Sequence, residues 1–213
     1  MKKILIVLCT LMFGSLCFAA EINKIADDAE QVAPLLNGQM LPDVVVSDLD
    51  GNSIKLKELV KNKPTVFIFY RGGWCPYCSA QLAGLRDVEK QIVDLGYQIV
   101  AISPDSPERL KEQALKSEFA VTLLSDNKFE ASSAFGIGFF LPDNLAARYK
   151  DKMGVEFASI DGTSKVALPV PAVYVADSEG VIHFQYVNPN FRVRVEPELL
   201  LQATKILDLA NQS

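Results

Sequence analysis

Short apolar runs alternate along this chain with stretches in which apolar side chains recur at the spacing of a helix. The runs are rich in β-branched and aromatic residues, which predicts buried strands at 66–70, 97–103, 121–124, 172–175 and 181–186. Helical spacing predicts helices at 21–36, 57–60, from just after Cys78 to Gly96, and at 106–116, 126–135 and 196–210. Strands and helices therefore alternate over most of the chain.

The rest of the pattern completes the expected fold. Alternating apolar residues at 44–46 and 54–56 flank an Asp50-Gly51-Asn52 turn, which predicts a β-hairpin. Residues 136–170 contain glycines and prolines that interrupt any period, and we expect irregular structure there. The order of elements matches an α/β protein with a thioredoxin-like fold: a mixed central sheet flanked by helices, with an N-terminal β-hairpin extension.

The first residues have the pattern of a secretory signal peptide. Lys2-Lys3 is the positively charged region, an apolar stretch follows at 4–11, and Cys17-Phe18-Ala19 provides small residues for cleavage before Ala20. A membrane anchor is the alternative, but the stretch is too short to span a bilayer comfortably. We expect a cleaved signal peptide at 1–19, an N-terminal helical segment at 20–37 and a thioredoxin-like domain at 38–213.

Export would place the protein in the periplasm or outside the cell, which are oxidising compartments, with no stable membrane insertion once the signal peptide is removed. The 213 residues are 49% apolar, so the chain can bury a substantial core. The formal charge is −5 and there is no basic cluster, which argues against nucleic acid as a partner.

Cys75 and Cys78 are the two cysteines that we expect in the mature protein, because Cys9 and Cys17 lie in the leader. They form a Cys-Pro-Tyr-Cys motif between the strand at 66–70 and a helix, and Pro76 suits the first helical position. A thiolate at the first turn of a helix is stabilised by unpaired backbone N–H groups and the positive end of the helix dipole. The spacing places the two thiols close enough for a disulfide, so we expect attack by one thiolate and resolution by the other.

Three other uses of these cysteines are less well supported. A metal site needs further ligands, and the single histidine, His183, lies in a predicted strand far along the chain, so we expect no metal and no cofactor. A hydrolase would need the same histidine as its base, and we interpret His183 as an ordinary sheet residue. A purely structural disulfide across so short a loop would add little stability.

Four segments resemble the alkyl hydroperoxide reductase/thiol-specific antioxidant branch of the thioredoxin superfamily, that is, bacterial peroxiredoxin-like proteins. They are Phe69-Tyr70-Arg71-Gly72-Gly73-Trp74-Cys75-Pro76-Tyr77-Cys78, Val100-Ala101-Ile102-Ser103-Pro104, Leu124-Ser125-Asp126 and Leu168-Pro169-Val170-Pro171. The resemblance covers about residues 38–210. It implies reduction of a hydroperoxide and an external thiol reductant such as a thioredoxin-like protein.

The resemblance also implies roles for single residues. In the family's Thr-x-x-Cys pattern, Cys78 falls on the peroxidatic cysteine and Cys75 replaces the threonine, whereas in glutaredoxins and thioredoxins the first cysteine of the motif attacks. The family's active-site arginine is missing from its expected place, because Pro171 stands near there. Pro171 matches the cis-proline that contacts thiol substrates in thioredoxin-like proteins; a trans, strand-starting proline is the alternative.

Two residues before the first cysteine complete the expected site. We expect Trp74 to wall the cysteine pocket, with a buried core tryptophan as the alternative. Arg71 could stabilise a thiolate or a peroxide oxygen, with an exposed loop arginine as the alternative.

The leading hypothesis is an antioxidant oxidoreductase that reduces hydroperoxides through a dithiol/disulfide cycle of Cys75 and Cys78. A periplasmic thiol–disulfide oxidoreductase acting on protein disulfides is the alternative. A non-enzymatic redox-sensing or binding module is the third hypothesis.

Overall fold

The computed structural model describes residues 25–116, 121–155, 157, 160, 162 and 164–211. The predicted signal peptide at 1–19 and the first part of the segment at 20–37 lie outside the described residues. Within the described ranges, none of the helices has the length and apolar character that crossing a membrane requires.

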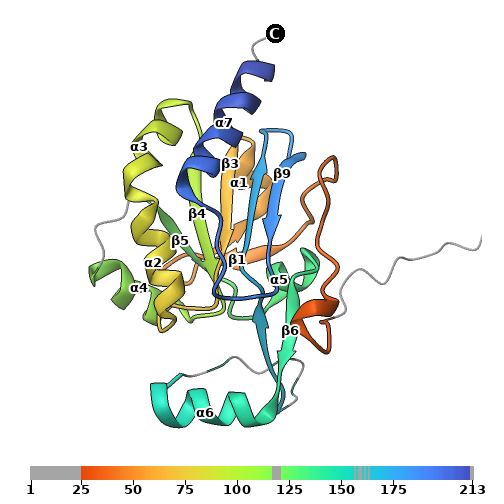
Figure 1. Cartoon of the computed structure of the whole chain (residues 1–213), viewed down its shortest axis with the longest axis vertical. Helices are drawn as coiled ribbons and strands as arrows, with labels where there is room; N and C mark the ends of the chain where they lie inside the picture. The colour runs from red at the N-terminus through yellow and green to blue at the C-terminus, as the bar shows by residue number, and fades with distance from the viewer. Residues whose placement is uncertain are drawn as a thin grey trace, which may run out of the picture.

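A seven-stranded mixed sheet forms the centre of the molecule, in the order β2-β1-β5-β4-β3-β8-β9 (Figure 1). The predicted strands all form, and their bounds are β1 (Val45–Ser47), β2 (Ser53–Lys55), β3 (Thr65–Phe69), β4 (Gln98–Ser103), β5 (Thr122–Ser125), β8 (Ala172–Ala176) and β9 (Ile182–Val187). Strands β3, β4 and β5 are parallel, whereas β1, β2, β8 and β9 pair antiparallel with their neighbours. The mixed sheet and the β1–β2 hairpin are as predicted.

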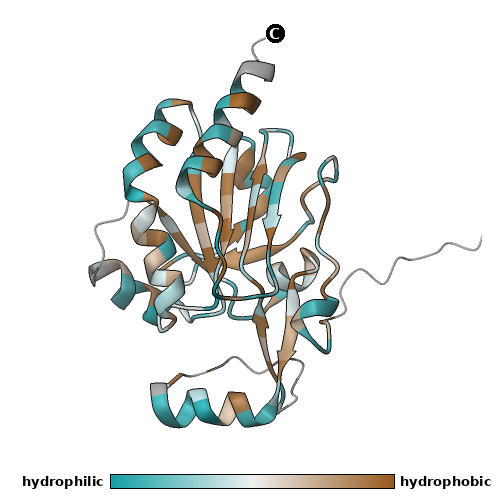
Figure 2. Ribbon diagram, viewed as in Figure 1, coloured by the Kyte–Doolittle hydropathy of each residue, from teal (hydrophilic) through white to brown (hydrophobic). Residues whose placement is uncertain are grey.

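Helices cover both faces of the sheet because the side chains of its central strands alternate between the faces and are apolar on both. The helices are α1 (Leu56–Val60), α2 (Pro76–Gly84), α3 (Arg86–Asp94), α4 (Pro107–Lys116), α5 (Glu130–Ala134), α6 (Asp143–Met153) and α7 (Pro197–Asn211), with a short 3-10 helix, η1 (Ala29–Gln31). Val66 and Ile68 of β3 pack with α2, α3, α4 and α7, whereas Phe67 and Phe69 pack with α1 and α5. Figure 2 shows the hydrophobic strands between helices whose outer faces are hydrophilic.

Some predicted segments differ from the structure. The helix predicted from just after Cys78 to Gly96 forms as two helices, α2 and α3, which meet at Leu85. The helix predicted at 21–36 is wrong over its described part, where only η1 is helical. Ala26 instead forms backbone hydrogen bonds on either side of Phe139: its N–H donates to Gly138 O (2.9 Å) and its carbonyl accepts from the Phe140 N–H (2.8 Å). This pairing with a strand satisfies the backbone groups that a helix would otherwise have used.

The irregular structure expected at 136–170 is also wrong. This segment forms β6 (Gly138–Leu141), α6 and β7 (Val166–Pro169), and β6 pairs with β7 in a separate two-stranded sheet. Helix α6 is rich in charged residues, but its Leu145 and Tyr149 pack with Leu141, Val166 and Trp74. The apolar face is too narrow for periodicity to reveal and becomes evident only through its tertiary contacts.

The topology brings two distant loops to one edge of the sheet. Phe69, the last residue of β3, and Val187, the last residue of β9, both pair with Ala172 of β8. Because β8 is antiparallel to both, β3 and β9 run in the same direction and their carboxyl ends lie together. The loop after β3 carries the cysteines, and the loop after β9 contains residues 188–196.

Candidate active site

The two cysteines occupy the first turn of α2. Cys75 is the N-cap residue in an extended conformation, Pro76 opens the helix, and Cys78 lies within its first turn. The backbone N–H groups of Cys78 and Ser79 donate to the Cys75 carbonyl at 3.0 and 3.1 Å. Both cysteines are free thiols and each is only 1% exposed. The predicted placement at a strand-to-helix junction is confirmed.

Gly72 and Gly73 shape the loop before Cys75. Gly72 has a φ of +141°, and a Cβ there would lie 2.4 Å from Trp74 Nε1 and 2.9 Å from Asp105 Oδ1, so only glycine fits. The Gly73 N–H donates to Asp105 Oδ2 at 2.7 Å. Burial raises the pKa of Asp105, a shift that this hydrogen bond opposes. Asp105 therefore anchors the cysteine loop to the end of β4.

Arg194 contacts the cysteine pair although sequence reasoning missed it. Its Nη2 lies 3.3 Å from Cys78 Sγ and its Nη1 donates to Gln81 Oε1 at 3.0 Å, so one guanidinium group contacts α2 at two positions. The residue belongs to the loop after β9, and its role depends on β9 running in the same direction as β3. The sequence carried no signal for this role, because the strand pairing in the folded sheet decides which loop lies beside the cysteines.

Arg71 is buried rather than exposed in a loop, at 3% exposure. Its guanidinium carbon lies 5.1 Å from the ring centre of Trp74, 5.2 Å from that of Tyr149 and 4.4 Å from that of Phe191. Its Nη2 also donates to the Tyr149 hydroxyl at 3.2 Å. Residues from three separate parts of the chain therefore enclose one cation by cation–π contacts.

Trp74 is half-buried, and its ring lies 5.1 Å from that of Tyr149 on α6. It therefore forms one wall of the enclosure around Arg71, directly before Cys75. Phe191 contacts Arg71 and also packs 5.6 Å from the ring of Tyr77, between the two cysteines. These contacts hold the loop that carries Arg194 against the cysteine motif.

The two thiols are strongly coupled. A hydrogen bond from the Cys78 thiol lowers the pKa of Cys75 to about 6. Burial opposes this shift, whereas the Cys78 backbone N–H and the charges of Arg71 and Arg194 add to it. The same hydrogen bond, together with burial and the negative charge on Cys75, raises the pKa of Cys78. Near neutral pH the pair therefore holds one thiolate and one thiol, with Cys75 ionised.

Most of the chain matches one known protein family. Residues 37–185 match the AhpC/TSA family. The chain belongs to the AhpC/TSA family. Residues of this chain are 33% identical over 104 residues to peroxiredoxin Bcp of Escherichia coli strain K12, covering 49% of this chain and 66% of that one. They are 30% identical over 156 residues to the chloroplastic peroxiredoxin Q of Populus jackii, covering 73% of this chain and 62% of that one. Both matches span less than two thirds of the relative's length.

Solved structures of peroxiredoxins share the fold. The crystal structure of peroxidoxin BcpB from Mycobacterium tuberculosis superposes with a TM-score of 0.62 at 18% identity, covering 80% of this chain and 97% of that one. Reduced Prx3 from Vibrio vulnificus superposes with a TM-score of 0.64 at 19% identity, covering 80% of this chain and 99% of that one. The predicted thioredoxin-like fold is therefore confirmed.

The arginine that the AhpC/TSA resemblance led us to regard as missing has a counterpart in space. Pro171 does stand before β8, but Arg194 supplies a guanidinium group to Cys78 from the following loop. The threonine position of the family pattern is occupied by Cys75, whose thiol hydrogen-bonds with Cys78. This AhpC/TSA chain thus combines an arginine at one cysteine with a second cysteine at the threonine position.

The prediction of a cis peptide bond at Pro171 is wrong, because the described residues contain no cis peptide bond. The Val170 N–H donates to Ile137 O at 2.9 Å, and the Pro171 carbonyl accepts from the Asn188 N–H at 3.1 Å. These hydrogen bonds lie on both sides of an extended trans path into β8. Pro171 is at the same sheet edge as the cysteine loop, because Ala172 pairs with Phe69.

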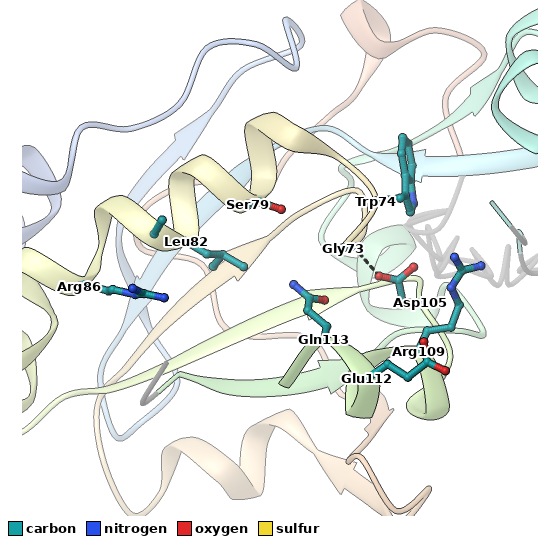
Figure 3. Close-up of a pocket in the computed structure, with 10 residues that line it drawn as sticks. Gly73, Trp74, Ser79, Leu82, Arg86, Asp105, Arg109, Glu112 and Gln113 are labelled. Carbon is teal, nitrogen blue, oxygen red and sulfur yellow. Dashed lines mark hydrogen bonds between the residues drawn. The ribbon is translucent and has the colours of Figure 1, made fainter. Parts of the chain in front are cut away.

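A cavity of about 490 Å³ lies beside α2, and neither cysteine lines it (Figure 3). Figure 3 shows Ser79 and Leu82 of α2 and Arg86 of α3 opposite Arg109, Glu112 and Gln113 of α4, with Asp105 near Trp74. The cavity is therefore next to the cysteine helix but not at the two sulfur atoms.

A search of the described residues finds no group of three or more His, Cys, Asp or Glu side chains that could hold a metal ion. His183 lies in β9 as an ordinary sheet residue, as interpreted from the sequence, and its Nε2 is 2.6 Å from Asp177 Oδ2.

Proposed function

We propose that this protein is a thiol-dependent peroxidase that reduces hydroperoxides through a dithiol/disulfide cycle of Cys75 and Cys78. The observation that carries the proposal is the coupled thiol pair at the start of α2, facing the guanidinium groups of Arg71 and Arg194. Membership of the AhpC/TSA family supports a peroxide as the oxidant. A small hydroperoxide suits a pair of thiols that are each 1% exposed.

In the proposed cycle the Cys75 thiolate attacks the terminal peroxide oxygen. The sulfur–oxygen bond forms as the oxygen–oxygen bond breaks, and the leaving alkoxide or hydroxide takes a proton to depart as alcohol or water. Cys75 is then a sulfenic acid. The Cys78 sulfur attacks Cys75, water leaves, and the disulfide forms. Two equivalents of an external thiol, such as those of a thioredoxin-like protein, reduce the disulfide.

Each residue around the pair has a role in this cycle. Arg194 and Arg71 stabilise the negative charge that starts on sulfur and moves to oxygen in the transition state. Trp74 positions Arg71 by contact with its guanidinium group. Asp105 holds the loop through Gly73 and so fixes the position of Cys75 at the helix N-terminus. Pro171 belongs to the adjacent edge, where a substrate would meet the end of the sheet.

The opposite order of attack is a second candidate, favoured by one contact. Arg194 lies against Cys78 rather than Cys75, and Cys78 is the cysteine at the family's peroxidatic position. The two orders differ in which single-cysteine variant still forms a sulfenic acid. If Cys75 attacks, Cys78→Ser treated with one equivalent of peroxide is labelled by dimedone on Cys75, and Cys75→Ser is not labelled. Labelling of Cys75→Ser on Cys78 alone would establish the opposite order.

Steady-state peroxide consumption with dithiothreitol or a thioredoxin system tests the function itself. We expect turnover by the wild type and its loss in both Cys75→Ser and Cys78→Ser, with Ser79→Ala as a control that leaves both thiols intact. Absence of turnover with hydrogen peroxide or an alkyl hydroperoxide, together with rapid reduction of insulin disulfides, would contradict the peroxidase proposal. It would instead support a protein thiol–disulfide oxidoreductase. Inactivity in both assays would favour a redox-sensing or binding module.

We further propose, from the leader sequence alone, that the protein acts in the periplasm or outside the cell. Expression of the full chain followed by cell fractionation and N-terminal sequencing is the test. A mature protein that begins at Ala20 in the exported fraction would support the proposal, and an uncleaved N-terminus in the cytosol would contradict it.

A further inference from the structure

Two cations face the thiol pair, and neither has a carboxylate partner among the residues that the structure describes. Arg194 donates to Gln81 and Cys78, and its Nε has no hydrogen-bond partner. Arg71 is 3% exposed, donates to the Tyr149 hydroxyl, and its Nε is likewise without a partner. Burying a guanidinium group without an opposite charge costs free energy, so these two cations require an anion nearby.

The other ionisable groups near the site do not supply that anion. Asp105 accepts the Gly73 N–H, and the positive charge of Arg109 acts on it and lowers its pKa. Tyr70 donates its hydroxyl proton to Gln113 Oε1 at 3.1 Å, and burial raises its pKa, so it remains neutral. The charge of the ionised cysteine is therefore the anion that Arg71 and Arg194 share.

Disulfide formation removes this anion while both cations remain. The reduced pair has one negative charge beside two positive charges, whereas the disulfide has none. The electrostatic free energy of the site therefore favours reduction. A disulfide whose reduced form is stabilised in this way is readily reduced and is a strong oxidant.

We propose that Arg71 and Arg194 together make the Cys75–Cys78 disulfide strongly oxidising, so that a mild monothiol such as glutathione is sufficient to reduce it. The reaction is disulfide plus two thiols giving the Cys75 thiolate, the Cys78 thiol, one released proton and one small-molecule disulfide. Two electrons pass from the thiols to the protein. The inference rests on only one part of the proposed function, namely that the two cysteines form a disulfide, and it requires no peroxide.

The first test is the redox equilibrium of the purified mature protein with mixtures of reduced and oxidised glutathione at pH 7. The fluorescence of Trp74, the only tryptophan in the chain, reports the state of the neighbouring pair, and alkylation followed by mass measurement confirms it. We expect Arg194→Met and Arg71→Met each to shift the equilibrium about tenfold toward the disulfide, which corresponds to about 1.4 kcal/mol. Arg194→Lys, which keeps the charge, should restore most of the wild-type value.

Arg192→Met is the matched control. Arg192 is an exposed residue of the same loop, stacks on Phe191 at 5.6 Å and has no contact with either cysteine among the described residues. Its loss removes one positive charge near the site, so an equally large shift in this variant would attribute the effect to general surface charge and overturn the proposal. An unchanged equilibrium in both Arg194→Met and Arg71→Met would also overturn it.

A second measurement uses the wild type alone and does not depend on variants that fold. If the reduced form is stabilised by the arginines, the reduced protein resists urea better than the disulfide form at pH 7, by thermodynamic linkage between folding and reduction. A disulfide form that is the more stable of the two would contradict the proposal. A peroxidase assay without turnover would leave both measurements interpretable, because neither involves a peroxide.

Discussion

Arg194 lies 3.3 Å from the sulfur of Cys78 although 116 residues separate them in the chain. The contact depends on β9 running in the same direction as β3, which brings the loop after each strand to the same edge of the sheet. The folded sheet thereby places the positive charge of Arg194 beside the Cys75–Cys78 motif.

Replacing Arg194 by methionine should slow peroxide reduction about 10- to 100-fold at pH 7, because a charge-assisted hydrogen bond to the reacting pair is worth about 1.5–3 kcal/mol. Stopped-flow measurement of Trp74 fluorescence on mixing the reduced protein with peroxide gives the rate. Arg192→Met should react like the wild type. A rate in Arg194→Met within twofold of the wild type would remove Arg194 from the proposed mechanism.

Titration of the reduced protein should show one thiolate forming near pH 6, because the Cys78 hydrogen bond lowers the pKa of Cys75 to about 6. The titration is followed by ultraviolet absorbance at about 240 nm, where a thiolate absorbs more strongly than a thiol. In Cys78→Ala the donor thiol is lost, so the midpoint should move to higher pH. A midpoint that stays above pH 8 in the wild type would contradict the coupling.

The same shift predicts how stability depends on pH. The pKa of Cys75 is lower in the folded protein than in an unfolded chain. Ionisation of Cys75 therefore stabilises the folded, reduced protein fully at pH values above the unfolded pKa. This stabilisation is lost as the pH falls through about 6. Urea denaturation of the reduced wild type should therefore show stability rising between about pH 6 and pH 9 relative to Cys75→Ser. Parallel curves for the two proteins would argue against a depressed pKa.

Gly72→Ala should destabilise the protein by about 1–3 kcal/mol and reduce peroxide turnover, because backbone strain adds to a clash at the cysteine loop. The φ of Gly72 is +141°, and the new Cβ would meet Trp74 and Asp105 at 2.4 and 2.9 Å. Gly51→Ala is the control, since Gly51 also has a positive φ (+83°) but has open space around it. Urea midpoints and peroxidase rates should show a larger stability loss and a selective loss of turnover at Gly72.

Asp105→Ala should remove the carboxylate that accepts the Gly73 N–H and cost about 0.5–1.5 kcal/mol of stability, because water can reach the exposed Gly73. The 2.7 Å hydrogen bond between them positions the cysteine loop, so the rate with peroxide should fall as well. Asp105→Asn, which keeps an acceptor oxygen, should recover much of both losses. Equal losses in the alanine and asparagine variants would mean that the negative charge, and not the hydrogen bond, is what matters.

Local patterns in the sequence were enough to predict the central strands, the hairpin, helices α4 and α7 and the placement of Cys75 and Cys78 before a helix. These features depend on side-chain periodicity and on turn or capping residues within a few positions, such as Pro76 at the start of α2. The family pattern around the cysteines is likewise contiguous in the chain. For these reasons the fold class and the candidate thiol pair could be predicted from the sequence.

Only the tertiary structure could decide the features that depend on contacts between distant residues. The narrow apolar face of α6 is recognisable only from its contacts, in which Tyr149 packs against Trp74 and Arg71. The trans path at Pro171 is held by two backbone hydrogen bonds, from Val170 to Ile137 and from Asn188 to Pro171. The role of Arg194 likewise follows from strand direction and pairing. Local sequence pattern was enough to propose Cys75 and Cys78 as the reactive pair. Packing of the sheet sets which charges surround them, because electrostatic interaction depends on distance in space and not on separation along the chain.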